Sequence, residues 1–356
     1  MSEAVFPGSE AGRELADKLD SILPPEGIVA TRLRDVAAHV RKMERGRADV
    51  SGLKGSAGAA VTATLAKDSA PNARVVVVTG DLDSARRMAD DMGFFLRGAL
   101  DEAEAEDSAS GDVLVLSVAE SSPYADVNPD RRAAMSRMAT LSHLAHLPWR
   151  VLVVPASALV RKVVPRSVFE KNTARIVAEQ ELDREALLKQ LSEGGYLRVP
   201  VVEDPGSFAV RGALLDVWPP SSEMPVRIEL YGDLVLSMKT FDAHEQRTKR
   251  ADGTEELLTE LWLPPAREVI LTKETLALAK DRVQQLAEMI DWPTTRTRTL
   301  IEDVMNGRAF FGADGFLPAY FPELETIFSY IDETATFVLD DPAAITAAVR
   351  EELERG

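Results

Sequence analysis

The sequence contains no cysteine among its 356 residues. That absence excludes disulfides and thiolate metal sites, and it fits a reducing cytoplasm. No apolar run approaches the roughly 20 residues that cross a bilayer, and the segment from Met1 to Gly8 has neither the basic start nor the apolar stretch of a secretory leader. We therefore expect a cytoplasmic protein without a membrane partner.

Basic residues are scarce relative to acidic ones. The chain has 41 Lys and Arg against 58 Asp and Glu, which gives a formal net charge of −17 at pH 7. A molecule with this charge repels phosphate backbones as a whole. We therefore do not expect tight, autonomous binding to nucleic acid, and an autonomous DNA-binding module is kept as an alternative to the function argued below.

The third absence is that of one lysine. Residues 53–62 read LKGSAGAAVT, where a nucleotide-binding enzyme would carry G-x-x-x-x-G-K-T. The motif lysine neutralises the β- and γ-phosphates, and the glycines let backbone N–H groups close around them. Gly55, Gly58 and Thr62 remain, but Ala60 replaces the second motif glycine and Val61 the lysine. We predict an inactive phosphate loop that holds neither ATP nor Mg²⁺; the alternative from the enzyme class is a working ATPase or helicase domain.

Helices and apolar strands alternate in the first half of the chain. Continuous apolar runs, which are typical of sheets covered on both faces, predict strands at 74–79, 113–116 and 150–154. The helices are predicted over 30–45, 59–67, 81–96 and 130–147. This rhythm indicates an α/β fold with a RecA-like, doubly wound parallel sheet.

The rhythm changes between about residues 165 and 253. One helix at 183–193 precedes closely spaced strands predicted at 196–202, 208–217 and 226–240, which indicates an inserted antiparallel α+β domain. A helix at 273–289, a strand at 336–339 and a helix at 343–353 then return to mixed α/β character. The predicted organisation is an extension (1–29), the first part of the α/β domain (30–164), the inserted domain (165–253) and the second part (254–356). The acidic loop 101–111 is expected to be mobile because it has almost no apolar residues to bury.

Three stretches inside the predicted insertion carry a specific match. They read PGSFAVRGALLDVWP (205–219), PVRIELYGD (225–233) and FDAHEQRT (241–248). They resemble the module shared by the excision-repair helicase UvrB and the bacterial transcription-repair coupling factors (Mfd), in which it binds UvrA. The stretches SPYADVNP (122–129) and VVPASAL (153–159) resemble the coupling factors specifically. The segment between Val118 and Arg132 is also too short for the long aromatic β-hairpin with which UvrB clamps DNA.

The resemblance implies a recruitment function rather than catalysis. In the family, the full chain continues into an RNA-polymerase-interacting domain and an ATP-dependent DNA translocase motor, neither of which this sequence contains. RNA polymerase, DNA, ATP and Mg²⁺ are therefore expected as partners or cofactors of those further domains only. For these residues the resemblance implies a non-catalytic UvrA-recruiting module in transcription-coupled nucleotide excision repair.

The resemblance places the UvrA contacts on Arg211, Arg227 and Tyr231. Strand alternation supports this independently, because it sets Arg227, Glu229 and Tyr231 on the face opposite Val226, Ile228 and Leu230. We expect the first face to be solvated. Arg and Tyr are also enriched at interface hot spots. The alternative is a polar outer face that has no partner.

Two further patterns have ordinary explanations. Val338 to Asp341 superficially resembles an apolar strand ending in a Mg²⁺-binding acidic pair, but Pro342 after Asp341 favours an N-cap for the next helix. His143 and His146 have a spacing that could present two imidazoles to a metal. Because no Cys or carboxylate nearby completes a ligand set, a packing or surface role is the preferred interpretation.

Overall fold

A four-stranded parallel sheet organises the first of two modules in the computed structural model, which describes residues 33–42, 47–68, 74–97, 113–118, 130–248, 255–307 and 316–355. Its strand order is β11 (Thr336–Leu339), β1 (Val75–Thr79), β3 (Val151–Pro155) and β2 (Val113–Val115). All three strand pairs are parallel. Because β1 and β3 are central and covered on both faces, every one of their residues is buried.

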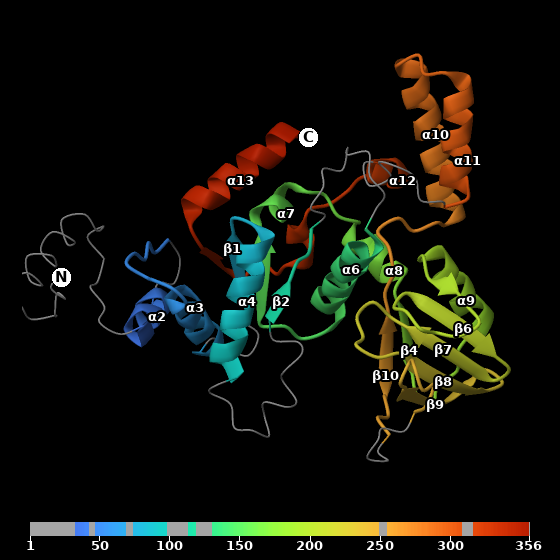
Figure 1. Ribbon diagram of the computed structural model, residues 1–356, viewed down its shortest axis with the longest axis horizontal. Coiled ribbons are helices and arrows are strands. Elements are labelled where there is room, and N and C mark those ends of the chain that lie inside the picture. The colour runs from blue at the N-terminus through green and yellow to red at the C-terminus, as the bar shows by residue number, and fades with distance from the viewer. Residues whose placement is uncertain are drawn as a thin grey trace, which may run out of the picture.

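Helices cover both faces of the parallel sheet (Figure 1). On one face, α3 (Ala57–Asp68) and α4 (Leu82–Arg97) share a core with Val75, Val77, Val151 and Val153. The odd-numbered valines of β1 face these helices, so its even-numbered residues face the other layer. That layer contains α6 (Arg131–His146), α7 (Ala156–Val160), the 3-10 helix η2 (Ile327–Tyr330) and α13 (Pro342–Arg355). A further helix, α2 (Leu33–Lys42), packs on α3 through Ala37.

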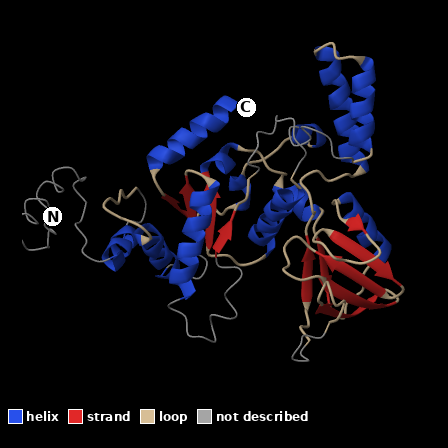
Figure 2. Cartoon of the chain, in the orientation of Figure 1, coloured by secondary structure: helices blue, strands red, loops and turns tan. Residues whose placement is uncertain are grey.

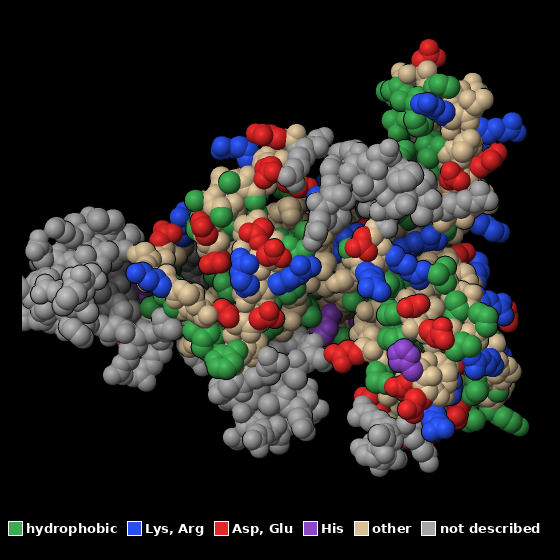
Figure 3. Space-filling view, in the orientation of Figure 1, with side chains coloured by type: hydrophobic (Ala, Val, Ile, Leu, Met, Phe, Trp, Pro, Cys, Tyr) green, Lys and Arg blue, Asp and Glu red, His purple; other side chains and the backbone are tan. Residues whose placement is uncertain are grey.

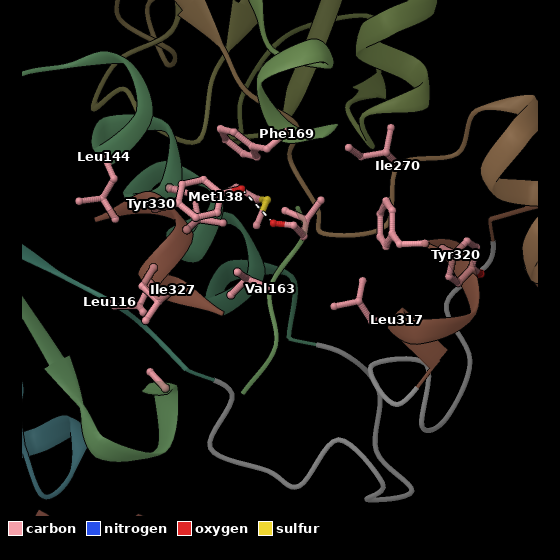
Figure 4. Packing of buried hydrophobic residues seen from close by; sticks show 14 of the residues in the cluster. Leu116, Met138, Leu144, Val163, Phe169, Ile270, Leu317, Tyr320, Ile327 and Tyr330 are labelled. Atoms are coloured by element: carbon pink, nitrogen blue, oxygen red, sulfur yellow. Dashed lines mark hydrogen bonds between the residues drawn. The ribbon is translucent and has the colours of Figure 1, made fainter. Parts of the chain in front are cut away.

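The largest core cluster joins distant parts of the chain. Met138 and Leu144 of α6, Phe169 of α8 (Arg166–Lys171), and Ile327 and Tyr330 of η2 converge in it (Figure 4). The Tyr330 hydroxyl donates to the Val164 carbonyl at 3.0 Å, so its polar atom is satisfied inside the core. Burial raises the pKa of this phenol well above its ordinary value.

The second module is built on a five-stranded sheet, seen at the lower right of Figure 2. Its order follows the chain: β5 (Leu197–Arg198), β6 (Ser207–Arg211), β7 (Leu214–Trp218), β8 (Val226–Tyr231) and β9 (Leu234–Thr240). The pair β5–β6 is parallel and the others are antiparallel. The inner face packs against α9 (Arg184–Glu193) through Leu187 and Leu191.

Two strands predicted as single runs are hairpins, so those two predictions are wrong. The run 208–217 breaks at Gly212-Ala213, and the run 226–240 breaks at Gly232-Asp233. Both loops have two residues and begin with a glycine at positive φ, 59° and 61° respectively. Glycine at the first loop position is the arrangement of a type II′ turn, which matches the twist of the strands that it joins. The predicted strand 196–202 is also shorter in the structure, at Leu197–Arg198.

Shorter elements connect the two modules. Strand β4 (Ala174–Val177) pairs antiparallel with β10 (Glu260–Leu263), and the chain then forms the helical hairpin α10 (Lys273–Met289) and α11 (Thr294–Met305). This hairpin extends away from both sheets in Figure 1, and the short helix α12 (Leu317–Tyr320) lies near its base. Sequence reasoning did not predict β4, β10, α7, α8, α11 or α12.

The fold class predicted from the sequence is confirmed: an α/β parallel sheet and a separate antiparallel sheet are both present. Strand β11, from beyond the second module, pairs with β1 from before it, so the two flanking segments join one sheet as predicted. The predicted extension 1–29, the acidic loop 101–111 and the stretch 122–129 lie outside the described residues. The predicted domain boundary at residue 253 also falls in a range that is not described. Within the described part of the chain, no helix has the length and apolar character needed to span a bilayer.

Helix α6 fixes the second module to the first. Arg137 forms a bidentate pair with Glu268, which follows β10, at 3.1 and 2.8 Å. The Arg131 guanidinium donates to the Gly206 carbonyl at 2.7 Å. The pair Arg137–Glu268 is mostly removed from solvent, so its electrostatic attraction is weakly screened.

Candidate partner-binding face and degenerate phosphate loop

The degenerate phosphate loop leads directly into helix α3. Gly55 has φ 56°, the helix begins at Ala57, and the Ala60 amide already donates to the Ser56 carbonyl at 3.0 Å. Val61 is 5% exposed and packs with Ala37 and Leu65. The position of the missing lysine is therefore part of the contact between α2 and α3.

The remaining polar groups near the loop do not suit a phosphate. The Thr62 hydroxyl donates to the Gly58 carbonyl at 2.9 Å, and Thr62 is buried. The Asp340 carboxylate lies beside Gly58, where an added Cβ would meet its Oδ1 at 3.9 Å. Burial and the neighbouring Asp341 raise the pKa of Asp340 above its ordinary value. A half-buried acidic side chain thus stands next to the loop, where it would repel an anion.

The acidic pair after β11 has the capping role that we expected. The Asp341 carboxylate accepts a hydrogen bond from the Ala344 amide at 3.1 Å, inside the first turn of α13. Of the two histidines of α6, one stacks on an aromatic ring and the other forms a hydrogen bond. His146 stacks on Trp262 with ring centroids 4.1 Å apart, and His143 Nε2 lies 2.9 Å from the Pro148 carbonyl oxygen. In the part of the chain that the structure describes, no group of three or more His, Cys, Asp or Glu could hold a metal.

The five-stranded sheet has an inner face against α9 and an outer face that carries the predicted partner-binding residues. Burial alternates along β8 as predicted: Val226, Ile228 and Leu230 are buried, whereas Arg227 and Glu229 are half-buried and Tyr231 is exposed. The register places Arg211 opposite Leu214, and Leu214 opposite Glu229. Arg211 and Tyr231 each precede a hairpin glycine, and both hairpins close at the same end of the sheet, where the Leu230 amide donates to the Ala213 carbonyl.

Arg211 and Tyr231 have free surface in the structure. Tyr231 is 76% exposed. The Arg211 guanidinium donates to the Pro200 carbonyl from Nε at 3.2 Å and Nη2 at 2.9 Å, and these are its only hydrogen bonds among the described residues. The carbonyl holds the side chain in place while its charge has no carboxylate partner in the described chain. Arg211 thus presents an oriented cation at the end of the sheet that also carries the exposed ring of Tyr231.

Arg227 does not lie on a solvated surface as we expected. Its guanidinium makes a bidentate pair with Asp216 on the neighbouring strand at 2.7 and 2.9 Å, and the two side chains are only 15% and 2% exposed. The guanidinium carbon lies 4.7 Å from the centre of the Phe241 ring. The hydrogen bonds that its guanidinium donates to Asp216 raise the pKa of Arg227. The expectation was wrong because alternation fixes the face of a side chain but not whether later segments cover that face.

A second, small core covers this part of the outer face. Val202, Ala209 and Phe241 are buried together, with Val199 and Trp218 against them. The outer face is therefore divided. The half around Arg227 is packed, and the half around Arg211 and Tyr231 is open.

Sequence reasoning missed Asp216 and Phe241 as the partners of Arg227. A signal was present, since Asp216 interrupts the apolar run LLDVW and alternation puts it on the outer face of β7. A lone carboxylate at such a position requires a cation, and Arg227 lies opposite it in the register.

Comparison with known proteins matches the part of the chain that contains the five-stranded sheet. The UvrB interaction domain family matches residues 175–261, which extend from β4 into β10. A protein named transcription-repair-coupling factor from Myxococcus xanthus is 37% identical over 318 residues, which are 87% of this chain and 25% of that protein.

Two more proteins of the same name are similar over shorter ranges. The one from Escherichia coli strain K12 is 29% identical over 289 residues, which are 80% of this chain and 23% of that protein. The one from Bacillus subtilis strain 168 is 31% identical over 236 residues, which are 66% of this chain and 18% of that protein. This chain thus spans a quarter or less of each of these relatives, and the predicted resemblance is confirmed.

Proposed function

We propose, from the premise that this chain is a homologue of the transcription-repair coupling factors and carries a UvrB interaction domain, that it recruits UvrA and performs no catalysis of its own. The observation that carries the proposal is the open half of the outer face. It presents the oriented Arg211 guanidinium and the exposed Tyr231 ring at one end of a rigid sheet. A fixed charge and a large ring lose little rotamer freedom on binding, which is why such residues dominate interfaces.

Arg227 has an indirect role in this proposal. Its pair with Asp216 ties β8 to β7 in the packed half, beside the open half, so Arg227 supports the surface and is not itself offered to the partner. UvrA would then meet Arg211 and Tyr231 directly. As in the predicted family function, recruitment would bring UvrA to sites where RNA polymerase has stalled; contacts with the polymerase and with DNA are assigned to domains outside these residues.

We also propose that the chain binds no ATP–Mg²⁺ in the micromolar range. Val61 supplies no charge and is packed in a core, and Asp340 would add repulsion to any phosphate beside Gly58. Calorimetric titration of the chain with ATP and Mg²⁺ tests this. ATP-dependent thermal stabilisation that disappears on substitution of Gly55 would contradict it.

The recruitment surface is tested by measuring the affinity of purified UvrA for the chain and its variants. Arg211→Ala and Tyr231→Ala should each weaken binding about thirtyfold, which corresponds to about 2 kcal/mol for a hot-spot residue. Phe94→Ala on α4 is the matched control for Tyr231, because Phe94 is 68% exposed on the other module. Arg86→Ala, on the same helix as Phe94, is the control for Arg211→Ala. If both surface variants bind UvrA like the parent while remaining folded, UvrA binds elsewhere.

A further inference from the structure

An irregularity in the hairpin β8–β9 changes which side chains face outward. The register shifts between Glu229 and Leu230: Glu229 lies opposite Ser237, and Leu230 lies opposite Val235. Leu236 is therefore the extra residue of a β-bulge. In a bulge, two successive residues of one strand oppose a single position of the other. The result is that Leu236 joins Leu234 on the outer face instead of packing inside.

The outcome is an exposed apolar patch formed by Tyr231, Leu234 and Leu236. Tyr231 and Leu234 are directly paired, and the three side chains are 76%, 36% and 51% exposed. The inner residues of the same strand, Val235 and Met238, are buried, so β9 packs into the core without Leu234 and Leu236. Three large apolar groups that adjoin one another and remain exposed indicate contact with another molecule.

The backbone of β9 leaves little room for an added strand. At its start, the Glu179 amide donates to the Val235 carbonyl and the Val235 amide to the Gln180 carbonyl. At its end, the Leu258 amide donates to the Met238 carbonyl and the Thr240 amide to the Glu256 carbonyl. Strand addition requires a row of unpaired backbone groups. The patch is thus suited to contact through side chains.

The charges next to the patch define the partner's chemistry. Glu229 accepts a hydrogen bond from the Ser237 hydroxyl at 3.0 Å, so this carboxylate is engaged within the sheet. Arg211 lies two strands away from Glu229 in the same row of the register, and its charge has no carboxylate partner in the described chain. An acidic group on the partner would therefore complement Arg211, and an apolar surface would complement the patch.

We propose that Leu234 and Leu236 form the apolar half of the UvrA-binding surface, and that this surface receives an apolar region of UvrA edged by a carboxylate that pairs with Arg211. This inference rests on the proposed function. The proposed interface has two parts. Arg211 provides a charge, and Tyr231, Leu234 and Leu236 provide apolar surface that loses water on binding. The bulge at Glu229 and Leu230 is the device that creates the second part.

Leu236→Ser and Leu234→Ser test this in the full chain. Each should weaken UvrA binding at least about tenfold, as expected for loss of a buried leucine side chain at an interface. The matched control is Leu286→Ser on α10, because Leu286 is 52% exposed and Leu236 is 51% exposed; the control should bind UvrA as the parent does. The salt dependence of binding should persist in Leu236→Ser and decrease in Arg211→Ala, since only the second variant removes a charge pair. Melting curves verify that every variant is folded.

The outcomes separate this inference from the proposed function. If the parent chain does not bind UvrA, the proposed function itself fails. If the parent binds and Tyr231→Ala weakens binding, but Leu234→Ser and Leu236→Ser bind like the parent, only the apolar half is wrong. Equal weakening by Leu286→Ser would also overturn it, because the effect would then not belong to the patch.

Discussion

Whether a side chain of this molecule is exposed or buried depends more on the segments that cover it than on its residue type. Arg211 and Arg227 lie on the same face of one sheet, yet one is exposed and the other forms a bidentate pair with a buried carboxylate. Asp216 is 1% exposed, so removal of Arg227 would leave an uncompensated charge in a packed environment. The two arginines should therefore respond to mutation in different ways.

Arg227→Ala should lower the free energy of unfolding by about 3–5 kcal/mol, the usual cost of breaking a buried ion pair by removing one partner. Denaturant unfolding of the purified chain measures this. The double variant Asp216→Leu with Arg227→Met removes both charges and should be closer to the parent in stability. An Arg227→Ala protein as stable as the parent would mean that Asp216 is hydrated in solution.

Asp340→Asn should stabilise the protein at neutral pH. Because the folded protein raises the pKa of Asp340 above its ordinary value of 3.8, it binds this proton more tightly than the unfolded chain does. Protonation of Asp340 therefore stabilises the folded protein. This contribution is fully present below the ordinary pKa and is lost as the pH rises through the raised pKa. Solvent screens a half-buried carboxylate, so we expect an increase in melting temperature of only about 1–2 °C at pH 7.

Thermal melting of the parent and Asp340→Asn between pH 4 and pH 8 provides the measurement. The difference between the two proteins should shrink as the pH falls towards 3.8. Asp341→Ala should act in the opposite direction at pH 7, because it removes the hydrogen bond to the first turn of α13. A constant difference between parent and Asp340→Asn at every pH would rule out titration of Asp340 as the cause.

At the scale of elements, two glycines differ in the backbone conformation that they adopt. Gly232 begins the turn of the hairpin β8–β9 at φ 61°, and an added Cβ there would have no heavy atom within 4 Å. The cost of a side chain is therefore the left-handed backbone alone. Gly58, in the first turns of α3, has no such backbone conformation and also has space for a Cβ.

Gly232→Ala should destabilise the protein by about 1–2 kcal/mol, whereas Gly58→Ala should stabilise it by about 0.5–1 kcal/mol, because alanine is the better helix former. Denaturant midpoints of the two variants measure both effects. Because the expected changes in stability have opposite signs, each variant serves as a control for the other. Loss of stability in Gly58→Ala would indicate that the loop before α3 still requires its glycine.

The elements that the sequence predicts well are uninterrupted apolar strands and long helices. The apolar runs at β1 and β3 and the helix α6 lie within a residue or two of their predicted bounds. The hairpin loops were not recognised because Gly-Ala and Gly-Asp interrupt the strands for only two residues. Strands β4 and β10 have four residues each and form a pair only across a distance of more than 80 residues. For the site, the sequence could give the face of Arg227 but not the segment around Phe241 that covers it.

At the scale of the whole molecule, contacts of α6 hold the two modules in one arrangement. The pair Arg137–Glu268, the bond from Arg131 to Gly206 and the stack of His146 on Trp262 all join them. On the face seen in Figure 3, acidic and basic side chains are interspersed over both modules, and this view has no continuous basic surface.

Arg137→Ala should lower the free energy of unfolding by about 3 kcal/mol and uncouple the modules. Amide hydrogen exchange along a denaturant series reports on β3 in one module and on β7 in the other. The unfolding transitions of the two strands should coincide with Arg137 present and separate in Arg137→Ala. Coincident transitions in both proteins would show that the other contacts of α6 suffice.

The parallel pairing of β1 with β11 has a consequence for how the protein is made. Val75 lies opposite Thr336, so the ribosome must synthesise almost the whole described chain before this strand pair can form. The hairpins of the second module need only neighbouring residues, and a chain emerges at roughly 5–20 residues per second. The antiparallel sheet can therefore fold while β1 is still without its neighbour β11. During that interval of many seconds, the edge of the valine strand β1 that β11 later covers stays open, and an open strand edge is a site for pairing with other chains.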